Sequence, residues 1–234
     1  MIRFAALLLL AGQPSNELLD KASAALQAGK IDEALALATK AIEADPKNAD
    51  AYQFRGIVHF KLAKIEPSIR DFDKYIELRP EKKISHWQRG ISYYYAGKYD
   101  EGRKQFEGYQ DFDSNDVENA VWRFMCMAKV DGMEKARKAI LKIGDDKRVP
   151  MRQVYDLFKG ELKPDDVLAA AKAGNPAKGQ LNSQLFYAHL YVGIYYDLAG
   201  DRKRALENLD AAVDHRIGHY MWDVARVHRD LLKK

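Results

Sequence analysis

The sequence of 234 residues contains a single cysteine, Cys126. A lone cysteine excludes an intramolecular disulfide and any metal site that is built from several cysteines. Cys126 lies in the apolar stretch VWRFMCMAK, where an unpaired cysteine usually packs as a small buried hydrophobe. No histidine is spaced so as to activate it, so we do not expect it to act as a nucleophile.

A large excess of charge of one sign is also lacking. The 38 lysine and arginine residues against 34 aspartate and glutamate residues give a net charge of +4. No run of basic residues is long enough to form a phosphate-binding stripe, so we expect no nucleic acid among the partners. With 47% hydrophobic and 31% charged residues, the composition is that of an ordinary folded protein.

Motifs for catalysis and metal binding are absent, since there is no nucleophile elbow, Walker loop or H-E-x-x-H sequence. The stretch DFDSND begins like a calcium loop. That loop needs glycine and glutamate at the places that Asp116 and Trp122 occupy. We instead expect Asp116 near a helix N-terminus, where its carboxylate satisfies free backbone amides.

His215 and His219 have a spacing that could hold a metal ion on a continuous helix. Gly218 between them predicts a break in the helix, and no third ligand is evident. The sequence therefore predicts no catalytic residues, no metal and no cofactor. An enzyme or metal-binding protein without a recognisable motif remains an alternative.

Long apolar runs are limited to the start of the chain. Arg3 precedes an apolar run from Phe4 to Ala11, which is the order found in secretory signals. Residues 1–14 are therefore predicted to be a signal segment of a periplasmic or secreted protein. The alternative is the first turn of a helix in a cytoplasmic protein. No other stretch approaches the roughly 20 apolar residues of a membrane span.

What the sequence does contain is an internal repeat of 34 residues. The residues that recur at this distance are Pro46 and Pro80, Gly56 and Gly90, and the series Gly29, Ala63 and Gly97. Such a period is typical of stacked helix pairs. Small residues let the first helix of a pair (helix A) approach the second (helix B), and aromatic residues fill the adjoining volume.

The repeat predicts an organisation of the whole chain. Three units cover residues 15–116, a degenerate helical region covers 117–180, and a further unit with a C-terminal capping helix covers 181–234. Within the degenerate region, Pro164 and the two aspartates after it predict a helix start, and 174–183 reads as a linker. No strand pattern is present, so we expect an all-α solenoid, a right-handed superhelix of antiparallel helix pairs.

The period, with a proline at the end of each of the first units, resembles the tetratricopeptide repeat (TPR). The order of the repeats, followed by VWRFMCM, LFKGELKPDDV and the closing HYMWDVAR, resembles the NlpI-type TPR lipoproteins of bacterial cell envelopes. The lipobox cysteine of those proteins is missing. The resemblance implies a non-enzymatic scaffold or adaptor, often homodimeric, that recruits envelope proteases or peptidoglycan hydrolases. A cytosolic co-chaperone-like or assembly module is the alternative.

In TPR proteins, helix A lines a concave groove that binds proteins or peptides. The positions that correspond to this groove are Gln53, Ile57, Phe60 and Lys61 in the second unit, and Ile84, Trp87, Ile91, Tyr94 and Tyr95 in the third. The late unit supplies Tyr187, Leu190, Ile194 and Asp197, whereas Tyr93 and Tyr99 take core positions. Leu19 and Ser23 stand where carboxylate-binding relatives carry polar or basic residues, so no carboxylate clamp is expected.

An aromatic and aliphatic groove wall suits an extended or helical peptide with apolar anchors. The same wall could equally be covered by the C-terminal helix of the chain or by a partner in a dimer, because an apolar surface of this kind normally marks some interface.

Overall fold

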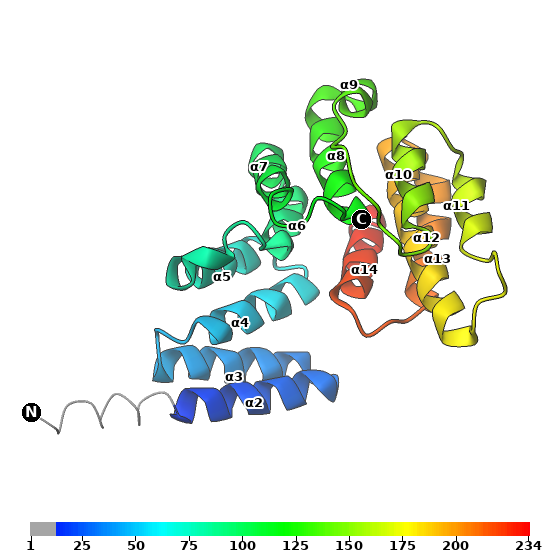
Figure 1. The fold of residues 1–234 in the computed structure, drawn as a ribbon. Coiled ribbons are helices and arrows are strands. Elements are labelled where there is room, and N and C mark those ends of the chain that lie inside the picture. The colour runs from blue at the N-terminus through cyan, green and yellow to red at the C-terminus, as the bar shows by residue number, and fades with distance from the viewer. Residues whose placement is uncertain (1–12) are drawn as a thin grey trace, which may run out of the picture. The chain divides into compact units, whose positions relative to one another are not determined.

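The computed structural model describes residues 13–234 of the chain (Figure 1). The predicted signal segment, residues 1–14, lies outside the described residues except for its last two. Every regular element between residues 13 and 234 is a helix and none is a strand, so the all-α prediction is confirmed.

The chain divides into two compact parts, an N-terminal part that ends at Ala96 and a C-terminal part from Gly97 to Lys234. The N-terminal part contains α2 (Gln13–Gln27), α3 (Ile31–Ala44), α4 (Ala49–Lys61), α5 (Ile65–Leu78), the short 3₁₀ helix η1 (Pro80–Lys82) and α6 (Trp87–Tyr95). The C-terminal part contains α7 (Tyr99–Tyr109), α8 (Val117–Asp131), α9 (Met133–Lys138), α10 (Met151–Lys159), α11 (Pro164–Ala170), α12 (Lys178–Leu198), α13 (Arg202–Asp214) and α14 (Tyr220–Leu232).

Close contact between helix A and helix B explains the repeated small residues. A Cβ atom on Gly56 of α4 would lie 2.6 Å from the ring of Phe72 on α5, which is too close for any side chain. Gly193 of α12 has the same relationship to α13, because its Cβ would lie 2.9 Å from Leu209 Cγ. Glycine at these two positions is therefore required by the packing of the pair.

The turn between helix A and helix B has the same backbone conformation in each of the first three pairs. Gly29 has φ of +78° and Gly97 has φ of +72°, and Ala63, at the same place in the second unit, has φ of +54°. All three lie in the left-handed region that ends a helix and reverses the chain. The series that recurs every 34 residues is thus a series of turn residues.

The repeat register continues into residues 117–180, the region that the sequence predicts to be a degenerate helical region. Arg55, Arg89 and Arg123 are each 34 residues apart, and each reaches a residue 16 positions earlier in the preceding helix B. The respective acceptors are Thr39 at 3.5 Å, Asp73 at 3.0 Å and Glu107 at 3.0 Å. α8 is therefore a further helix A, but only six helical residues of α9 follow it before an irregular strap, residues 139–149.

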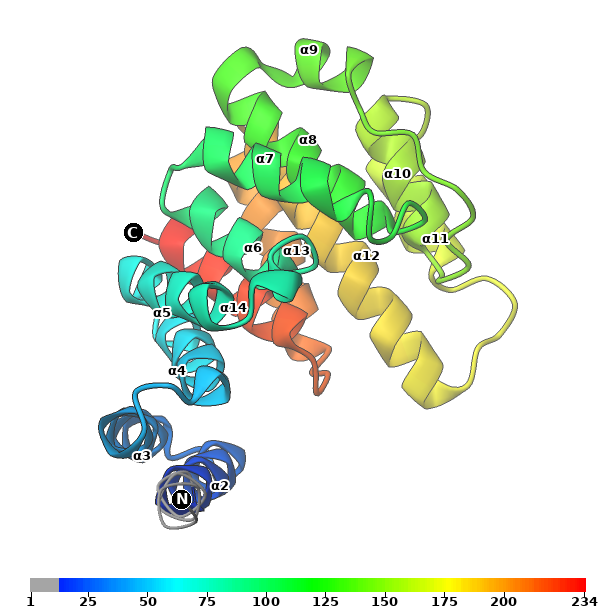
Figure 2. The ribbon, with the colours of Figure 1, turned by 60° about the vertical axis from the view of Figure 1, so that its left-hand side comes forward.

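Two boundaries of the C-terminal part test the predictions directly. α11 begins at Pro164 as expected, and the Asp166 carboxylate accepts a hydrogen bond from the Lys163 amide at 2.8 Å. The predicted linker at 174–183 is wrong in its second half, because α12 begins at Lys178 and runs for 21 residues (Figure 2). Leu181 and Leu185, one helical turn apart, give these residues a half-buried apolar stripe that favours the helix.

Candidate protein-binding surface

The predicted groove residues of the N-terminal part fall into two classes. Ile84 is 47% exposed, and the partly exposed set consists of Gln53, Ile57, Lys61, Trp87 and Tyr95. Phe60, Ile91 and Tyr94 are buried, with exposed fractions of 0%, 1% and 5%. The prediction that these three side chains face a groove is therefore wrong.

Packing between aromatic rings explains the burial of Phe60 and Tyr94. The Phe60 ring lies 5.7 Å from the ring of Tyr95, and Tyr94 meets Tyr95 edge to face at 5.3 Å. Tyr93, predicted to be core, is only half-buried. Its hydroxyl donates to Asp73 at 3.2 Å, and the guanidinium of Arg89 lies 5.5 Å from the centre of its ring. The assignment of the neighbouring tyrosines to core and surface is thus reversed for Tyr93 and Tyr94.

The late unit also differs from the prediction. Leu190 and Ile194 of α12 are fully buried and belong to the core. Tyr187 is half-buried, and Asp197 lies 3.3 Å from Lys129 Nζ and 3.4 Å from His228 Nε2. Burial alone would raise the pKa of Asp197, but the hydrogen bond and charge of His228, together with Lys129, lower it. These α12 residues hold the C-terminal part together rather than lining a groove.

A chain of hydrogen-bonded side chains connects α4 with the start of α6. His86 is the N-cap of α6, and its Nδ1 accepts a hydrogen bond from the amide of Arg89 at 3.2 Å. The ring proton must then lie on Nε2, which donates to Gln53 Oε1 at 2.7 Å. Gln53 Nε2 in turn donates to Gln88 Oε1 at 2.6 Å.

The hydrogen bonds that link His86, Gln53 and Gln88, called the amide chain below, all run in one direction from donor to acceptor. Burial, and secondly the charge of Arg89, lowers the pKa of His86 to about 4, so the ring is neutral and its proton position is stable at neutral pH. The last member, Gln88, is half-buried, and within residues 13–234 its amide nitrogen has no acceptor. Two N–H donors therefore remain available beside the partly exposed Gln53.

Gln53 is among the groove positions that the repeat predicts, whereas His86 and Gln88 are not. Gln53 and Gln88 are 35 residues apart, one more than the repeat, so the period alone does not pair them. The signal for His86 was its position directly before the helix that begins at Trp87. A side chain at the N-cap accepts a hydrogen bond from a backbone amide of the first turn, which fixes its orientation.

The acidic residues around α8 form a structural cluster. Asp116 is the N-cap of α8, as predicted, and accepts from the amide of Glu118 at 3.1 Å. Arg148 of the strap donates to Asp116 at 2.6 Å, to Glu118 at 2.8 Å and to Asp146 at 2.6 Å. Burial, and secondly the charge of Glu118, raises the pKa of Asp116 to about 6. The guanidinium occupies the centre of the cluster and ties the strap to α8.

Metal-ligating and nucleophilic side chains are scattered through residues 13–234. No group of three or more His, Cys, Asp or Glu side chains in this range is arranged to hold a metal ion. His215 ends α13 and His219 begins α14, so they do not share a helix. The Cys126 thiol is buried, and burial raises its pKa to about 12.

Among the described helices, none combines the length and the apolar character that crossing a bilayer requires.

Comparison with known protein families identifies the same kind of repeat that the helix pairs, the left-handed turns and the close glycine contacts indicate. Residues 19–82, which span most of α2 and all of α3, α4 and α5, match the family model described as tetratricopeptide repeat. Residues 19–82 therefore match tetratricopeptide repeats in sequence. The all-α TPR solenoid that the repeat predicts is confirmed as the fold class.

Solved TPR structures share this fold over most of the chain. A TPR protein from Parabacteroides merdae has a TM-score of 0.56 and 14% identity, with 94% of this chain and 84% of that one covered. MamA from Desulfovibrio magneticus has a TM-score of 0.52 and 14% identity, covering 87% and 95%. A thermophilic TPR protein of Thermus thermophilus has a TM-score of 0.51 and 13% identity, covering 93% and 99%. At these identities the likeness concerns the fold alone.

No curated protein matches the chain in sequence.

Proposed function

We propose that the chain is a non-enzymatic scaffold that binds segments of other proteins through the helix-A face of α4 and α6. The observation that carries the proposal is the amide chain that runs from His86 through Gln53 and ends at the two donors of Gln88. TPR proteins as a class are interaction modules, and α4, which supplies Gln53 and Ile57, lies within residues 19–82 that match the repeat family, while α6 follows directly after them.

The chemistry of the face suits the backbone of a peptide. A carbonyl oxygen of a bound segment would accept from Gln88, whose orientation is fixed in advance by Gln53 and His86. Such prior ordering reduces the entropy that binding costs. Ile57, partly exposed on α4, offers an apolar contact next to these amides. A segment that alternates backbone hydrogen bonds with apolar side chains fits this combination.

The identity and location of the partners rest on the resemblance to NlpI-type lipoproteins. We propose envelope proteases or peptidoglycan hydrolases as partners and the periplasm as the compartment, with a homodimer as the form to be tested. Cell fractionation and N-terminal sequencing of the mature protein test the location. A chain that begins with an intact Met1 in the cytoplasmic fraction would refute export.

The binding face is tested by affinity purification from native cells, with cross-linking and mass spectrometry. Gln88→Ala and Ile57→Asp should each reduce the recovery of a specific partner, because one removes the donors and the other places a charge on the apolar contact. Arg70→Ala, an exposed position on the helix B α5, is the matched control. Equal partner recovery by all three folded variants would refute the assignment of this face.

A further inference from the structure

Phe112 is an exposed aromatic residue between two acidic ones. It lies in the loop between α7 and α8, its side chain is 60% exposed, and Asp111 and Asp113 flank it. Phenylalanine is one of the aromatic residues that are enriched at protein–protein interfaces relative to the rest of the surface. The stretch DFDSND, which fails as a calcium loop, thus has the composition of an aromatic anchor with negative flanks.

The loop that carries Phe112 is held firmly on both sides. Gln110 Nε2 donates to the carbonyl of Lys142 at 2.9 Å, and the amide of Gly144 donates to the carbonyl of Ser114 at 3.0 Å. The Phe112 ring also meets the ring of buried Tyr109 edge to face at 5.4 Å. The strap therefore fixes the loop while most of the Phe112 ring stays exposed, so little further ordering is needed on binding.

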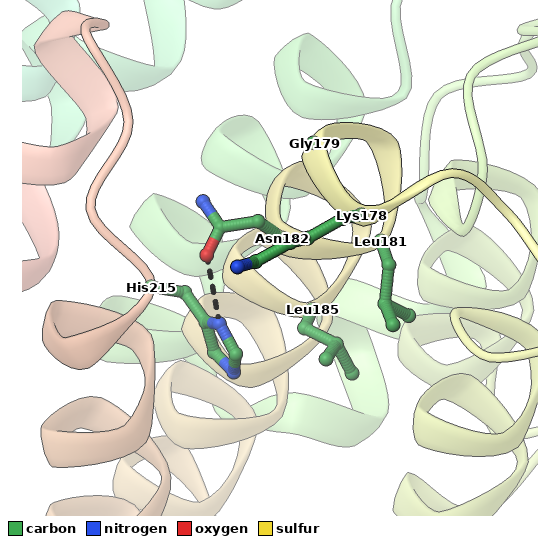
Figure 3. A pocket seen from close by; sticks show the side chains of 6 residues that line it. All are labelled: Lys178, Gly179, Leu181, Asn182, Leu185 and His215. Carbon is green, nitrogen blue, oxygen red and sulfur yellow. Dashed lines mark hydrogen bonds between the residues drawn. The ribbon is translucent and has the colours of Figure 1, made fainter.

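A pocket of about 510 Å³ opens in the same part of the chain, along the first turns of α12. Its lining residues are Lys178, Gly179, Leu181, Asn182, Leu185 and His215 (Figure 3). This volume is within the range of about 300–1,000 Å³ that is typical of ligand-binding pockets.

The pocket has an ordered wall. His215 Nδ1 lies 3.1 Å from Asn182 Oδ1, and the His215 ring stacks on His189 with 5.9 Å between ring centres. Asn182 also donates to the carbonyl of Arg216 at 3.0 Å. Leu181 and Leu185 supply the apolar surface that an aromatic ring would cover.

The positive charge on the rim of the pocket favours a ligand that carries negative charge. Lys178 lines the pocket, is exposed and carries a positive charge, and no acidic side chain is among the lining residues. The Phe112 loop brings two carboxylates on either side of an aromatic ring. The anchor and the pocket are thus complementary in both polarity and charge.

We propose that Phe112 of one copy of this chain inserts between Leu181 and Leu185 of a second copy, with the carboxylates of Asp111 and Asp113 on the side of Lys178. Phe112 does not line the pocket of its own chain, and its exposure leaves it available to another. If both Phe112 side chains of a pair insert reciprocally, the contact closes into a homodimer. If only one inserts, the contact is head-to-tail and continues into a ring or a chain of copies.

Sedimentation velocity of the purified full chain, measured over a range of concentrations, tests the proposal. The average mass should rise above the 26.7 kDa of one copy as the concentration increases. Phe112→Ala should weaken the association at least about tenfold, as expected for a central anchor. Val130→Ala is the matched control, because Val130 is 58% exposed on α8 and should leave the association unchanged.

Mixing two defective variants decides the geometry. Phe112→Ala lacks the anchor and Leu181→Asp lacks the apolar wall, so each alone should remain a single copy. Together they should form one-to-one dimers and nothing larger, because each retains the surface that the other lacks. Lys178→Glu, at an exposed position, serves as a second pocket variant if Leu181→Asp loses its helical circular dichroism.

Three outcomes would overturn the proposal. One is a wild-type mass of one copy at every concentration, which would leave the anchor and pocket to a different protein. The second is association of Phe112→Ala equal to that of the wild type. The third is failure of the two defective, folded variants to form a dimer. None of these outcomes affects the face of α4 and α6, whose test uses other residues.

Discussion

The guanidinium of Arg55 donates to both carboxylate oxygens of Asp71, with N–O distances of 2.8 and 2.7 Å. The pair joins helix A of the second repeat, α4, to its helix B, α5. Asp71 is 5% exposed, and its hydrogen bond raises the pKa of Arg55. A two-point charged contact between largely buried groups fixes the geometry of the helix pair more tightly than apolar packing alone.

We predict that Asp71→Ala destabilises the N-terminal part by about 3 kcal/mol, because it leaves a largely buried guanidinium without its counter-charge. The unfolding midpoint in urea, followed by circular dichroism, measures the change. Glu77→Ala removes an exposed ion pair with Lys74 on the same helix and should leave the midpoint almost unchanged. Equal effects of the two substitutions would contradict the prediction.

Gly193 provides a second prediction, on the packing of α12 against α13. The Cβ atom of Gly193→Ala would lie 2.9 Å from Leu209 Cγ and 3.2 Å from the carbonyl oxygen of Ala205. Because one of these neighbours is backbone, the two helices must separate slightly, and we expect a loss of about 1–3 kcal/mol. The loss should appear as a lower thermal midpoint.

Gly108→Ala is the control for this substitution. Gly108 lies in α7 and its Cβ would have no neighbour within 4 Å. Alanine has the higher helix propensity, so this variant should be as stable as the wild type or slightly more stable. If Gly193→Ala were equally well tolerated, close approach of the helices would not be the reason for the glycine.

The repeat could be predicted from the sequence because its constraints act at single positions. A turn that requires a left-handed backbone and a helix contact that excludes a Cβ leave glycine or alanine at fixed intervals, and Gly29, Gly56 and Gly97 show it. The start of α11 was predictable for the same reason, since proline and an N-terminal aspartate act locally.

The binding face was less predictable because exposure depends on the rotation of a helix. Successive residues on a helix differ by about 100° in direction, so an error of one position exchanges core and surface. Tyr93 and Tyr94 were exchanged in this way. The His86–Gln53–Gln88 chain needs the distance between α4 and α6, which the 34-residue period does not contain.

Ala63 is a position where the chain departs from its own repeat. Its φ of +54° is the conformation that glycine adopts at the equivalent positions 29 and 97. An L-residue with a Cβ is disfavoured there by roughly 1–2 kcal/mol. Glycine also increases the freedom of the unfolded chain, which offsets part of the gain.

We therefore predict that Ala63→Gly raises the stability of the N-terminal part by about 0.5–1 kcal/mol. Ala24→Gly is the matched control, because Ala24 lies within α2 outside the buried core and glycine should cost about 1 kcal/mol there. The two variants should shift the thermal midpoint in opposite directions. A decrease in both would show that the turn at Ala63 is not strained.

The neutral state of His86 makes the stability of the N-terminal part depend on pH. Its pKa is lowered from 6.5 to about 4 in the folded chain, chiefly by burial, whereas the unfolded chain binds the proton near pH 6.5. The contribution of His86 is therefore fully present above pH 6.5 and is lost as the pH falls from 6.5 towards 4. The full shift corresponds to about 3 kcal/mol.

His86→Asn isolates this contribution, because asparagine can still accept from the Arg89 amide as an N-cap but does not titrate. Urea midpoints of both proteins at a series of pH values should converge as the pH falls from 6.5 towards 4, since only the wild type loses the His86 contribution. All other ionisable groups are common to both proteins, so their contributions cancel in the difference. Parallel midpoint curves would mean that His86 accepts a proton in the folded state as readily as in the unfolded one, and the proton position on which the Gln53–Gln88 donors depend would then change within the physiological range.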